Sequence, residues 1–305
     1  MDTIRAMQTF VRAVELGSLS AVAREQHTTQ PTVSKVVAAL EKSLGVRLLD
    51  RTTTSLAPTE QGKRFYERAT RVLEEFGEAV SDARGLSETP AGRLRVSAPA
   101  SFGVLRLNAL MLDFLSLYPD IELELSFDDR FVDLVEEGVD VALRLGATLP
   151  PNVVARRIAA SPRYLVASPA YLRDRPRIRT PRDLARHEIL RFTWLSTGET
   201  IELDGPGGKV TLTAPCHYRV NNSLAMRESF LRGAGFGMTP AWLVQDLLDT
   251  GELVRVLPRW SGPTQDAFLL YPSRRYQPAR TNALLRFLAE RIPRLPGFVA
   301  PEASS

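Results

Sequence analysis

The sequence predicts an α/β protein with a helical domain of the winged helix–turn–helix type at its N-terminus. Helical periodicity and paired cap residues dominate residues 1–45. A seven-residue apolar repeat follows over 59–86, and segments with strand and helix patterns alternate from residue 92 onward. The chain has 305 residues, which is enough for about two domains with their own cores.

The first 45 residues predict three helices. The first helix is expected to bury one stripe, formed by Ile4, Met7, Phe10, Val11 and Val14. Residues 20–45 then predict two short helices joined by a tight turn at His27 and Thr28. Ser20 is the expected N-cap of a helix over 21–26, and Thr29 caps a helix that runs to Leu44. Pro31 in the first turn and Gly45 after the end both fit the second helix.

The two faces of the second of these helices differ in chemistry. At about 100° per residue, one face is apolar and consists of Val33, Val36, Val37, Leu40 and Leu44. The opposite face is small and cationic and consists of Pro31, Lys35, Ala38, Ala39 and Lys42. Such a face suits a helix in a DNA major groove, because bulky side chains would hold it away from the bases and acids would repel phosphates. A solvated helix of an ordinary helical domain is the alternative.

Residues 46–57 predict a β hairpin, or wing. Arg51 and the run of hydroxyl side chains from Thr52 to Ser55 are natural phosphate contacts, although a solvated Thr-rich turn would have the same composition. Residues 1–64 hold nine Lys/Arg and six Asp/Glu, so most of the net charge of +4 lies in this part of the chain. A basic N-terminal part on a nearly neutral body is expected of a DNA-binding module.

The chain resembles the N-terminal domain of LysR-type transcriptional regulators over a long run without gaps. The matching segments are Ala21-Val22-Ala23-Arg24-Glu25, Gln30-Pro31-Thr32-Val33-Ser34-Lys35, Leu40-Glu41, Leu44-Gly45-Val46-Arg47-Leu48-Leu49-Asp50-Arg51 and Leu56-Ala57-Pro58-Thr59-Glu60-Gln61-Gly62. The family typically has Leu in the helix before the turn, where this chain has Gln26 and His27. The resemblance implies a DNA-binding domain over 1–58 and, on its recognition helix, base or phosphate contacts from Gln30, Pro31, Thr32, Ser34 and Lys35.

Residues 59–91 predict a long helix and a hinge. Thr59 is the expected cap of a helix that runs to about Leu86. Its apolar residues recur at alternating steps of four and three, which is a coiled-coil seam formed by Phe65, Ala69, Val72, Phe76, Ala79, Ala83 and Leu86. A narrow stripe of this length is expected to need a partner helix, so Phe65, Ala69, Val72, Phe76 and Ala79 are predicted dimerisation residues. Packing of the helix on the C-terminal domain is the alternative.

Residues 92–295 predict an α/β domain. Strands are expected over 94–98, 121–127 and 139–145, with helices over 101–118 and 131–137, so that parallel strands form the sheet. A second set of strands is expected near 163–167, 188–192 and 218–220, with helices near 223–232 and 241–248. A strand over 267–271 and a helix over 280–292 close the domain, and the tail 296–305 is expected to fray.

These later segments resemble the effector domain of the same family, which is similar to periplasmic binding proteins. The resemblance implies two lobes with two chain crossings between them: lobe I over 92–162 and 267–295, and lobe II over 163–266. Ligands of open α/β sheets bind beyond the carboxyl ends of strands. Effector-binding candidates at such positions are Ser101, Phe102, Phe127, Arg144 and Asn222. Ser101 matches an effector-binding position of the family, yet it could be only an N-cap, and Phe102 and Phe127 could be core residues.

Catalytic and metal signals are missing from the sequence. Cys216 and His217 are neighbours in an extended segment and should point to opposite faces. The three histidines lack zinc-ligand spacing, and Val210 occupies the place where a phosphate-binding loop needs Ser or Thr. The glycines at 205–208 fit a hairpin turn, and those at 233–237 fit close packing after a helix. We therefore expect no enzyme activity and no cofactor.

The sequence thus predicts a ligand-responsive regulator that binds interrupted inverted-repeat DNA operators and a small effector, either anionic or aromatic. The expected partners are double-stranded DNA, the effector, further copies of the chain as a dimer and then a tetramer, and RNA polymerase if the protein is an activator. With a single cysteine, no signal peptide and no long apolar run, a cytoplasmic location without a membrane partner is expected. The alternatives are an α/β binding protein or enzyme with a dimerisation arm, and a constitutive architectural DNA-binding protein.

Overall fold

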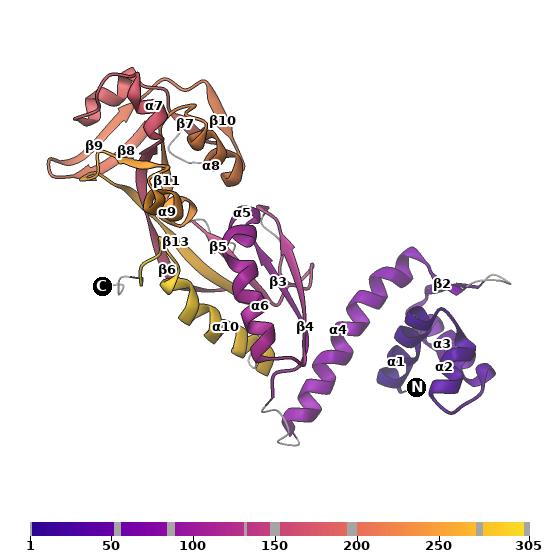
Figure 1. Ribbon diagram of the computed structural model, residues 1–305. Coiled ribbons are helices and arrows are strands. Elements are labelled where there is room, and N and C mark those ends of the chain that lie inside the picture. Colours follow the sequence, from indigo (N-terminus) through magenta and orange to yellow (C-terminus); the bar gives the residue numbers. More distant parts are fainter. Residues whose placement is uncertain are drawn as a thin grey trace. The chain divides into compact units, whose positions relative to one another are not determined.

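The structure is a computed structural model that describes residues 2–51, 56–83, 89–130, 133–146, 153–193, 200–272 and 277–301. The chain divides into two compact units, Met1–Thr89 and Pro90–Ser305. Both are drawn in Figure 1, and each is described here by itself. Thr52 of the predicted wing and Leu86 of the predicted seam lie outside the described residues.

The first unit is a helical bundle with a β hairpin. Its helices and strands are α1 (Thr3–Leu16), α2 (Leu19–Glu25), α3 (Gln30–Leu44), β1 (Leu49–Arg51), β2 (Leu56–Pro58) and α4 (Glu60–Ala83). Thr29 caps α3 by accepting from the Thr32 N–H, and Gly45 ends α3 at a φ of 71°. The N-cap of α2 is Ser18 and not Ser20, because the Ser18 hydroxyl accepts from the Ala21 N–H and the helix starts two residues earlier than expected.

The core of this unit lies where α1, α2 and α3 meet. Phe10, Val22, Val33, Val37 and Leu40 are almost completely buried in it. The apolar face of α3 is therefore confirmed up to Leu40. Leu44 departs from the expectation: it lies one turn further on, at the end of the helix, where its side chain is 42% exposed.

The long helix α4 buries the start of its seam within its own unit. Ala69 is 2% exposed, and the Phe65 ring lies 5.5 Å from the ring of Phe10 in α1. The expectation that the whole seam needs a partner helix is therefore wrong for Phe65 and Ala69, because α1 covers them. Val72 and Phe76, at 44% and 47% exposure, remain open, and Ala79 is exposed as well.

The second unit is organised on one seven-stranded mixed sheet. The strands are β3 (Gly92–Ala98), β4 (Ile121–Phe127), β5 (Val141–Leu145), β6 (Val153–Ala167), β11 (Gly237–Pro240), β12 (Val254–Val256) and β13 (Gly262–Pro272). Their order is β11-β6-β13-β5-β3-β4, with β12 paired to β6. The expected parallel pairing holds for β3 with β4 and with β5, whereas β13 runs antiparallel to β5 and β6.

Two long strands connect the lobes. The predicted strands over 163–167 and 267–271 are only the ends of β6 and β13, which have 15 and 11 residues and pair along most of their length. Both crossings are therefore paired strands of one sheet. The strand pattern of 153–162 was missed because this segment is interrupted by charged residues.

The second unit has helices in both lobes (Figure 1). They are α5 (Ala100–Phe102), a π-helical segment (Gly103–Leu107), α6 (Asn108–Leu117), α7 (Pro169–Arg173), α8 (Ser223–Leu231), α9 (Ala241–Thr250) and α10 (Ala279–Arg291), with 3₁₀ turns at Pro181–Arg186 and Ile292–Arg294. The helix expected over 131–137 is wrong for its described part: residues 134–138 form turns, in which the Val139 N–H donates to the Leu134 carbonyl.

Lobe II adds two small sheets. β7 (Leu190–Phe192) pairs in parallel with β10 (Tyr218–Val220), and β8 (Thr200–Gly205) forms a hairpin with β9 (Gly208–Thr213). The glycines at 205–208 form the turn of that hairpin, as expected. Gly235 packs closely, since a Cβ there would lie 2.6 Å from the Glu188 carbonyl oxygen.

The C-terminal segment is docked, not frayed, as far as Val299. The Val299 N–H and C=O exchange hydrogen bonds of 2.8 and 3.0 Å with Ala160. Ser161 is completely buried, and its hydroxyl donates to the Gly297 carbonyl at 2.7 Å. Phe298 is buried against Phe102. The hydrogen bonds are made to β6 and the ring contact to α5, both more than 130 residues away in the sequence, so no local pattern could indicate them.

One stretch, Ala100–Leu117, is long and apolar enough to span a membrane by length and composition. In the structure it is the core helix of lobe I, and Phe102, Leu107, Met111 and Phe114 on it are almost completely buried. A core helix passes the same test of length and composition as a membrane span.

Candidate functional site

The outer face of α3 is exposed and free of acidic side chains. Pro31, Lys35, Ala38, Ala39 and Lys42 are exposed, while Val33, Val37 and Leu40 on the other side hold the helix to the core. Gln30 and Thr32 at the start of α3 are exposed too, and Ser34 is half-buried. The predicted DNA-binding residues of this helix thus lie at its N-terminal end or along one open face.

The wing is held to the recognition helix by Glu41, which the sequence did not single out. Its carboxylate accepts from the N–H groups of Leu48 and Leu49 at 2.8 and 3.1 Å. Thr59 then closes the hairpin: its N–H donates to the Leu48 carbonyl, and its hydroxyl accepts from the Gly62 N–H at 2.9 Å. The sequence signal for this role is that Glu41 is an acidic residue in the last turn of the predicted recognition helix, where a carboxylate near DNA needs a partner within the protein.

β1 and β2 pair antiparallel from Leu49–Pro58 to Arg51–Leu56. The hairpin expected over 46–57 is therefore present in its described part. Arg51 occupies the last position of β1. This places the Arg51 backbone at the outer end of the wing.

Of the predicted effector residues, Ser101 contacts the start of α8, and Asn222 caps that helix. Ser101 is 3% exposed, and its hydroxyl accepts from the Leu224 N–H at 3.3 Å. Asn222 is the N-cap of α8 and accepts from the Ala225 N–H at 3.0 Å. The N-terminal ends of a lobe I helix and a lobe II helix therefore converge here, and both ends carry partial positive charge.

Asp129 also belongs to this junction and was not predicted. Its carboxylate accepts from the Ala100 N–H at 3.1 Å, so the first donor of α5 is already satisfied within the protein. The sequence signal was only its position two residues after the end of β4, where ligand-binding residues of parallel sheets gather.

Arg144 is buried and engaged. Its guanidinium donates to the Leu143 carbonyl at 2.9 Å, to the Ser97 hydroxyl at 3.0 Å and to the Arg130 carbonyl at 3.2 Å. Burial lowers the pKa of Arg144, and the nearby carboxylates of Asp128 and Asp129 oppose this effect. The guanidinium is therefore a fixed cation under the carboxyl ends of β3 and β5, and these three hydrogen bonds go to neutral oxygens.

The two phenylalanines predicted at the effector site are packing residues. Phe102 is completely buried and makes edge-to-face contacts with Trp242 and Phe298, with ring centroids 5.3 and 5.8 Å away. Phe127 lies over Gly103, where a Cβ would approach its ring to 2.4 Å. The Phe102 ring points into the core while Ser101, one residue earlier, faces α8, so packing is the role that the structure shows for Phe102, and its part in effector binding stays a prediction.

A partly exposed charge cluster lies near this junction. Asp246 of α9 pairs with Arg227 of α8 and with Arg106 at 3.1 Å, and Arg106 also donates to the Trp242 carbonyl. Hydrogen bonding to Arg227 and the two positive charges lower the pKa of Asp246. Arg106 lies in the π-helical segment of lobe I, a backbone form that is frequent at functional sites. The cluster ties the first helix of lobe I to α8 and α9.

The described residues hold no cluster of His, Cys, Asp and Glu that could bind a metal ion. Cys216 and His217 have separate partners: the Cys216 thiol donates to the Tyr218 carbonyl at 3.4 Å, and a His217 ring nitrogen lies 2.7 Å from Glu188.

Comparison with known proteins covers both units. Residues 4–63 match the model of the bacterial regulatory helix-turn-helix proteins of the lysR family, and residues 87–293 match the LysR substrate binding domain. The HTH-type transcriptional regulator PtxR of Pseudomonas aeruginosa is 34% identical over 287 residues, which cover 94% of this chain and 92% of PtxR.

Two solved structures are similar over the whole chain. CrgA, a LysR-type transcriptional regulator from Neisseria meningitidis, is 30% identical with a TM-score of 0.60 and covers 94% of this chain and 98% of its own. AphB, the virulence activator of Vibrio cholerae, is 28% identical with a TM-score of 0.58 and covers 94% and 98% of the two chains.

Proposed function

This chain belongs to the LysR family of bacterial transcriptional regulators. We propose that the residues that contact the bases of its operator lie on α3 and are Gln30, Thr32, Ser34 and Lys35. Arg51 and Thr52 contact the neighbouring phosphates. The family consists of regulators that bind DNA and small-molecule effectors and assemble into oligomers, and they are not enzymes. The proposal concerns which residues do this here, and it places the protein in the cytoplasm, where its DNA is.

The open face of α3 is the observation that supports the DNA interface. A helix that enters the major groove needs small residues along its length and polar residues at its leading end. Ala38 and Ala39 meet the first need, and Gln30 at the start of α3 offers an amide that can bond adenine with two hydrogen bonds. Paired recognition helices would read an interrupted inverted repeat, because two copies of the chain related by a twofold axis present identical helices.

A binding assay on systematically mutated operator DNA tests this interface. Gln30→Ala should cost about 1–3 kcal/mol at one base position and relax the preference there. Arg51→Ala should weaken binding to all sequences equally and flatten the dependence on salt. Lys209→Ala removes a cation from the β9 hairpin of the second unit and should change neither quantity. A uniform loss for Gln30→Ala would show that Gln30 does not read a base.

We place the effector at the junction of Ser101 with the start of α8. Two helix N-termini converge there and Arg144 is a fixed cation nearby, so a small anion is the favoured ligand. An effector that replaces the 3.3 Å contact between Ser101 and the Leu224 N–H would bind both lobes at once. Its affinity would then differ between open and closed lobes, which is what a ligand needs in order to shift a conformational equilibrium.

The Ser101→Val variant tests the effector site, and Ser116→Val on α6, whose exposed hydroxyl bonds only its own helix, is its control. A screen of small organic acids by thermal shift on the wild type supplies the ligand. Ser101→Val should abolish the response to that acid and leave operator binding intact, and Ser116→Val should respond normally. A normal response of Ser101→Val would show that the site is misplaced.

Val72 and Phe76 are the proposed dimerisation residues of α4, together with Ala79. They continue the seam beyond the part that α1 covers and leave two large apolar side chains in water. A second copy of the same helix would bury them. RNA polymerase is a further partner if the protein activates transcription.

A further inference from the structure

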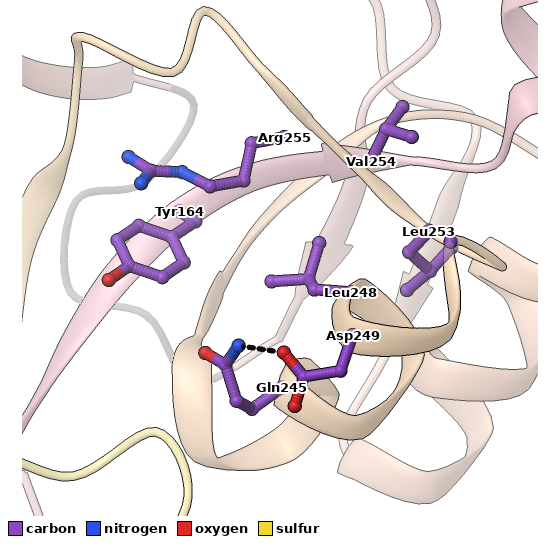
Figure 2. A pocket seen from close by; sticks show the side chains of 8 residues that line it. Tyr164, Gln245, Leu248, Asp249, Leu253, Val254 and Arg255 are labelled. Atoms are coloured by element: carbon purple, nitrogen blue, oxygen red, sulfur yellow. Dashed lines mark hydrogen bonds between the residues drawn. The ribbon is translucent and has the colours of Figure 1, made fainter.

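A cavity lies on lobe II, between the end of α9 and strands β6 and β12 (Figure 2). Its volume is about 380 Å³, within the range of small-molecule sites. Its lining residues are Tyr164, Gln245, Leu248, Asp249, Gly251, Leu253, Val254 and Arg255. None of them belongs to the Ser101 junction.

One side of the cavity is cationic. The Arg255 guanidinium lies over the Tyr164 ring, 3.8 Å from its centroid, and donates to the Pro258 carbonyl at 2.7 Å. Among the described residues, its Nε and Nη1 groups have no acceptor. Stacking fixes the plane of the guanidinium, so these donors are held in place for a carboxylate.

The other side accepts hydrogen bonds. Figure 2 shows Gln245 and Asp249 together at the end of α9, with Leu248 between them and the Tyr164–Arg255 pair in this view. The Gln245 side-chain N–H donates to an Asp249 carboxylate oxygen at 2.8 Å, so the Gln245 carbonyl oxygen points away from Asp249. Within the described part of the chain, neither this Gln245 oxygen nor the second Asp249 oxygen has a hydrogen-bond donor. α9 ends at Gly251, and the C-terminal end of a helix favours a positive charge.

We propose that this cavity binds a small zwitterion with an aliphatic side chain, such as an apolar α-amino acid. Its carboxylate bonds Arg255, its ammonium group bonds Asp249 and Gln245, and its side chain covers Leu248 and Val254. A simple anion or a simple amine satisfies only half of the cavity, because the lining contains one cation and one anion. The site goes beyond the proposed effector function, since it uses none of the same residues.

Isothermal titration of the full chain tests the site with L-leucine as the probe. Isovalerate, which lacks the ammonium group, and isopentylamine, which lacks the carboxylate, should each bind at least about tenfold more weakly than leucine. Asp249→Asn and Arg255→Gln should each weaken leucine by about tenfold, whereas Arg255→Lys retains the charge and should lose less. Asp113→Asn on α6 and Arg259→Gln beyond β12 change exposed charges outside the cavity and should bind leucine normally.

Three results would overturn the proposal: no heat with millimolar leucine, equal binding of leucine and isovalerate, or unchanged binding in both Asp249→Asn and Arg255→Gln. The Ser101→Val variant separates this site from the effector junction. Leucine binding that persists in Ser101→Val supports the second site whatever that variant does to the effector response. If leucine binding disappears in Ser101→Val and persists in Arg255→Gln, then leucine binds at the Ser101 junction and the proposal is wrong.

Discussion

Gly62 and Gly77 lie on the same helix, α4, and their replacement by Ala should have opposite effects. A Cβ on Gly62 would lie 1.9 Å from the Leu48 carbonyl oxygen, whereas a Cβ on Gly77 meets nothing within 4 Å. Because Ala favours a helix over Gly by about 1 kcal/mol, both substitutions gain the same intrinsic term. Only Gly62→Ala forces the backbone of α4 away from the wing.

The magnitude follows from the distances. The Cβ and the Leu48 oxygen must separate by more than 1 Å to reach even 3.0 Å. Leu48 cannot move freely, since Glu41 holds its N–H and the Thr59 N–H holds its carbonyl. Overpacking against fixed groups costs about 1–3 kcal/mol or more, so we expect a net loss of about 2 kcal/mol for Gly62→Ala and a gain of about 1 kcal/mol for Gly77→Ala.

Thermal unfolding of the full chain, with amide hydrogen exchange in α1 and α3 to report on the first unit, measures both effects. For a unit of this size, about 1 kcal/mol corresponds to roughly 4–8 °C. Gly62→Ala should thus lower the Tm of the first unit by roughly 10 °C and weaken operator binding, and Gly77→Ala should raise the Tm by roughly 5 °C. If Gly62→Ala is as stable as wild type, the contact between α4 and the wing is not as close as described, and the reasoning fails.

Three further predictions concern the seam, the charge cluster and the docked tail. Val72→Glu should place like charges at the centre of the α4 seam and convert the oligomer to smaller species, as measured by light scattering. Glu67→Gln lies off the seam and should leave the mass unchanged. An unchanged mass for Val72→Glu would show that the seam is not part of the interface. The pKa of Asp246 is lowered in the folded state by Arg227 and Arg106, so its contribution to stability is complete above the ordinary carboxyl pKa of about 4 and is lost as the pH falls through the lower folded value. Unfolding followed over pH should therefore show a smaller acid loss in Asp246→Asn than in wild type, and identical profiles would contradict this. Ser161→Ala should lower the free energy of unfolding by about 1–3 kcal/mol, because it leaves the Gly297 carbonyl and the buried Trp242 N–H without their partner. Amide hydrogen exchange at 297–299 should become faster. Slow exchange there would show that the tail is held without Ser161.

Local structural features could be predicted from the sequence because the contacts that cause them lie within a few residues. The hydroxyl of Thr29 and the positive φ of Gly45 define the ends of α3 by contacts with adjacent turns. β4 has the predicted bounds, Ile121–Phe127, because an alternating pattern over seven residues shows one buried face by itself. The same holds for the open face of α3, which follows from the period of the helix.

Tertiary structure decided everything that depends on a distant partner. Phe65 and Ala69 belong to a regular heptad, yet α1 covers them, so only the later part of the seam is open. Ser101 and Phe102 are adjacent, and the sequence predicts both as effector-binding residues. In the fold, Ser101 faces α8 and the Phe102 ring packs in the core. The sequence alone determined the family, from its resemblance over the N-terminal segments, and the recognition helix, from its short period and its cap residues. The effector junction, the docked tail and the cavity beside α9 depend on which surfaces meet, and a single sequence does not contain that information in local form.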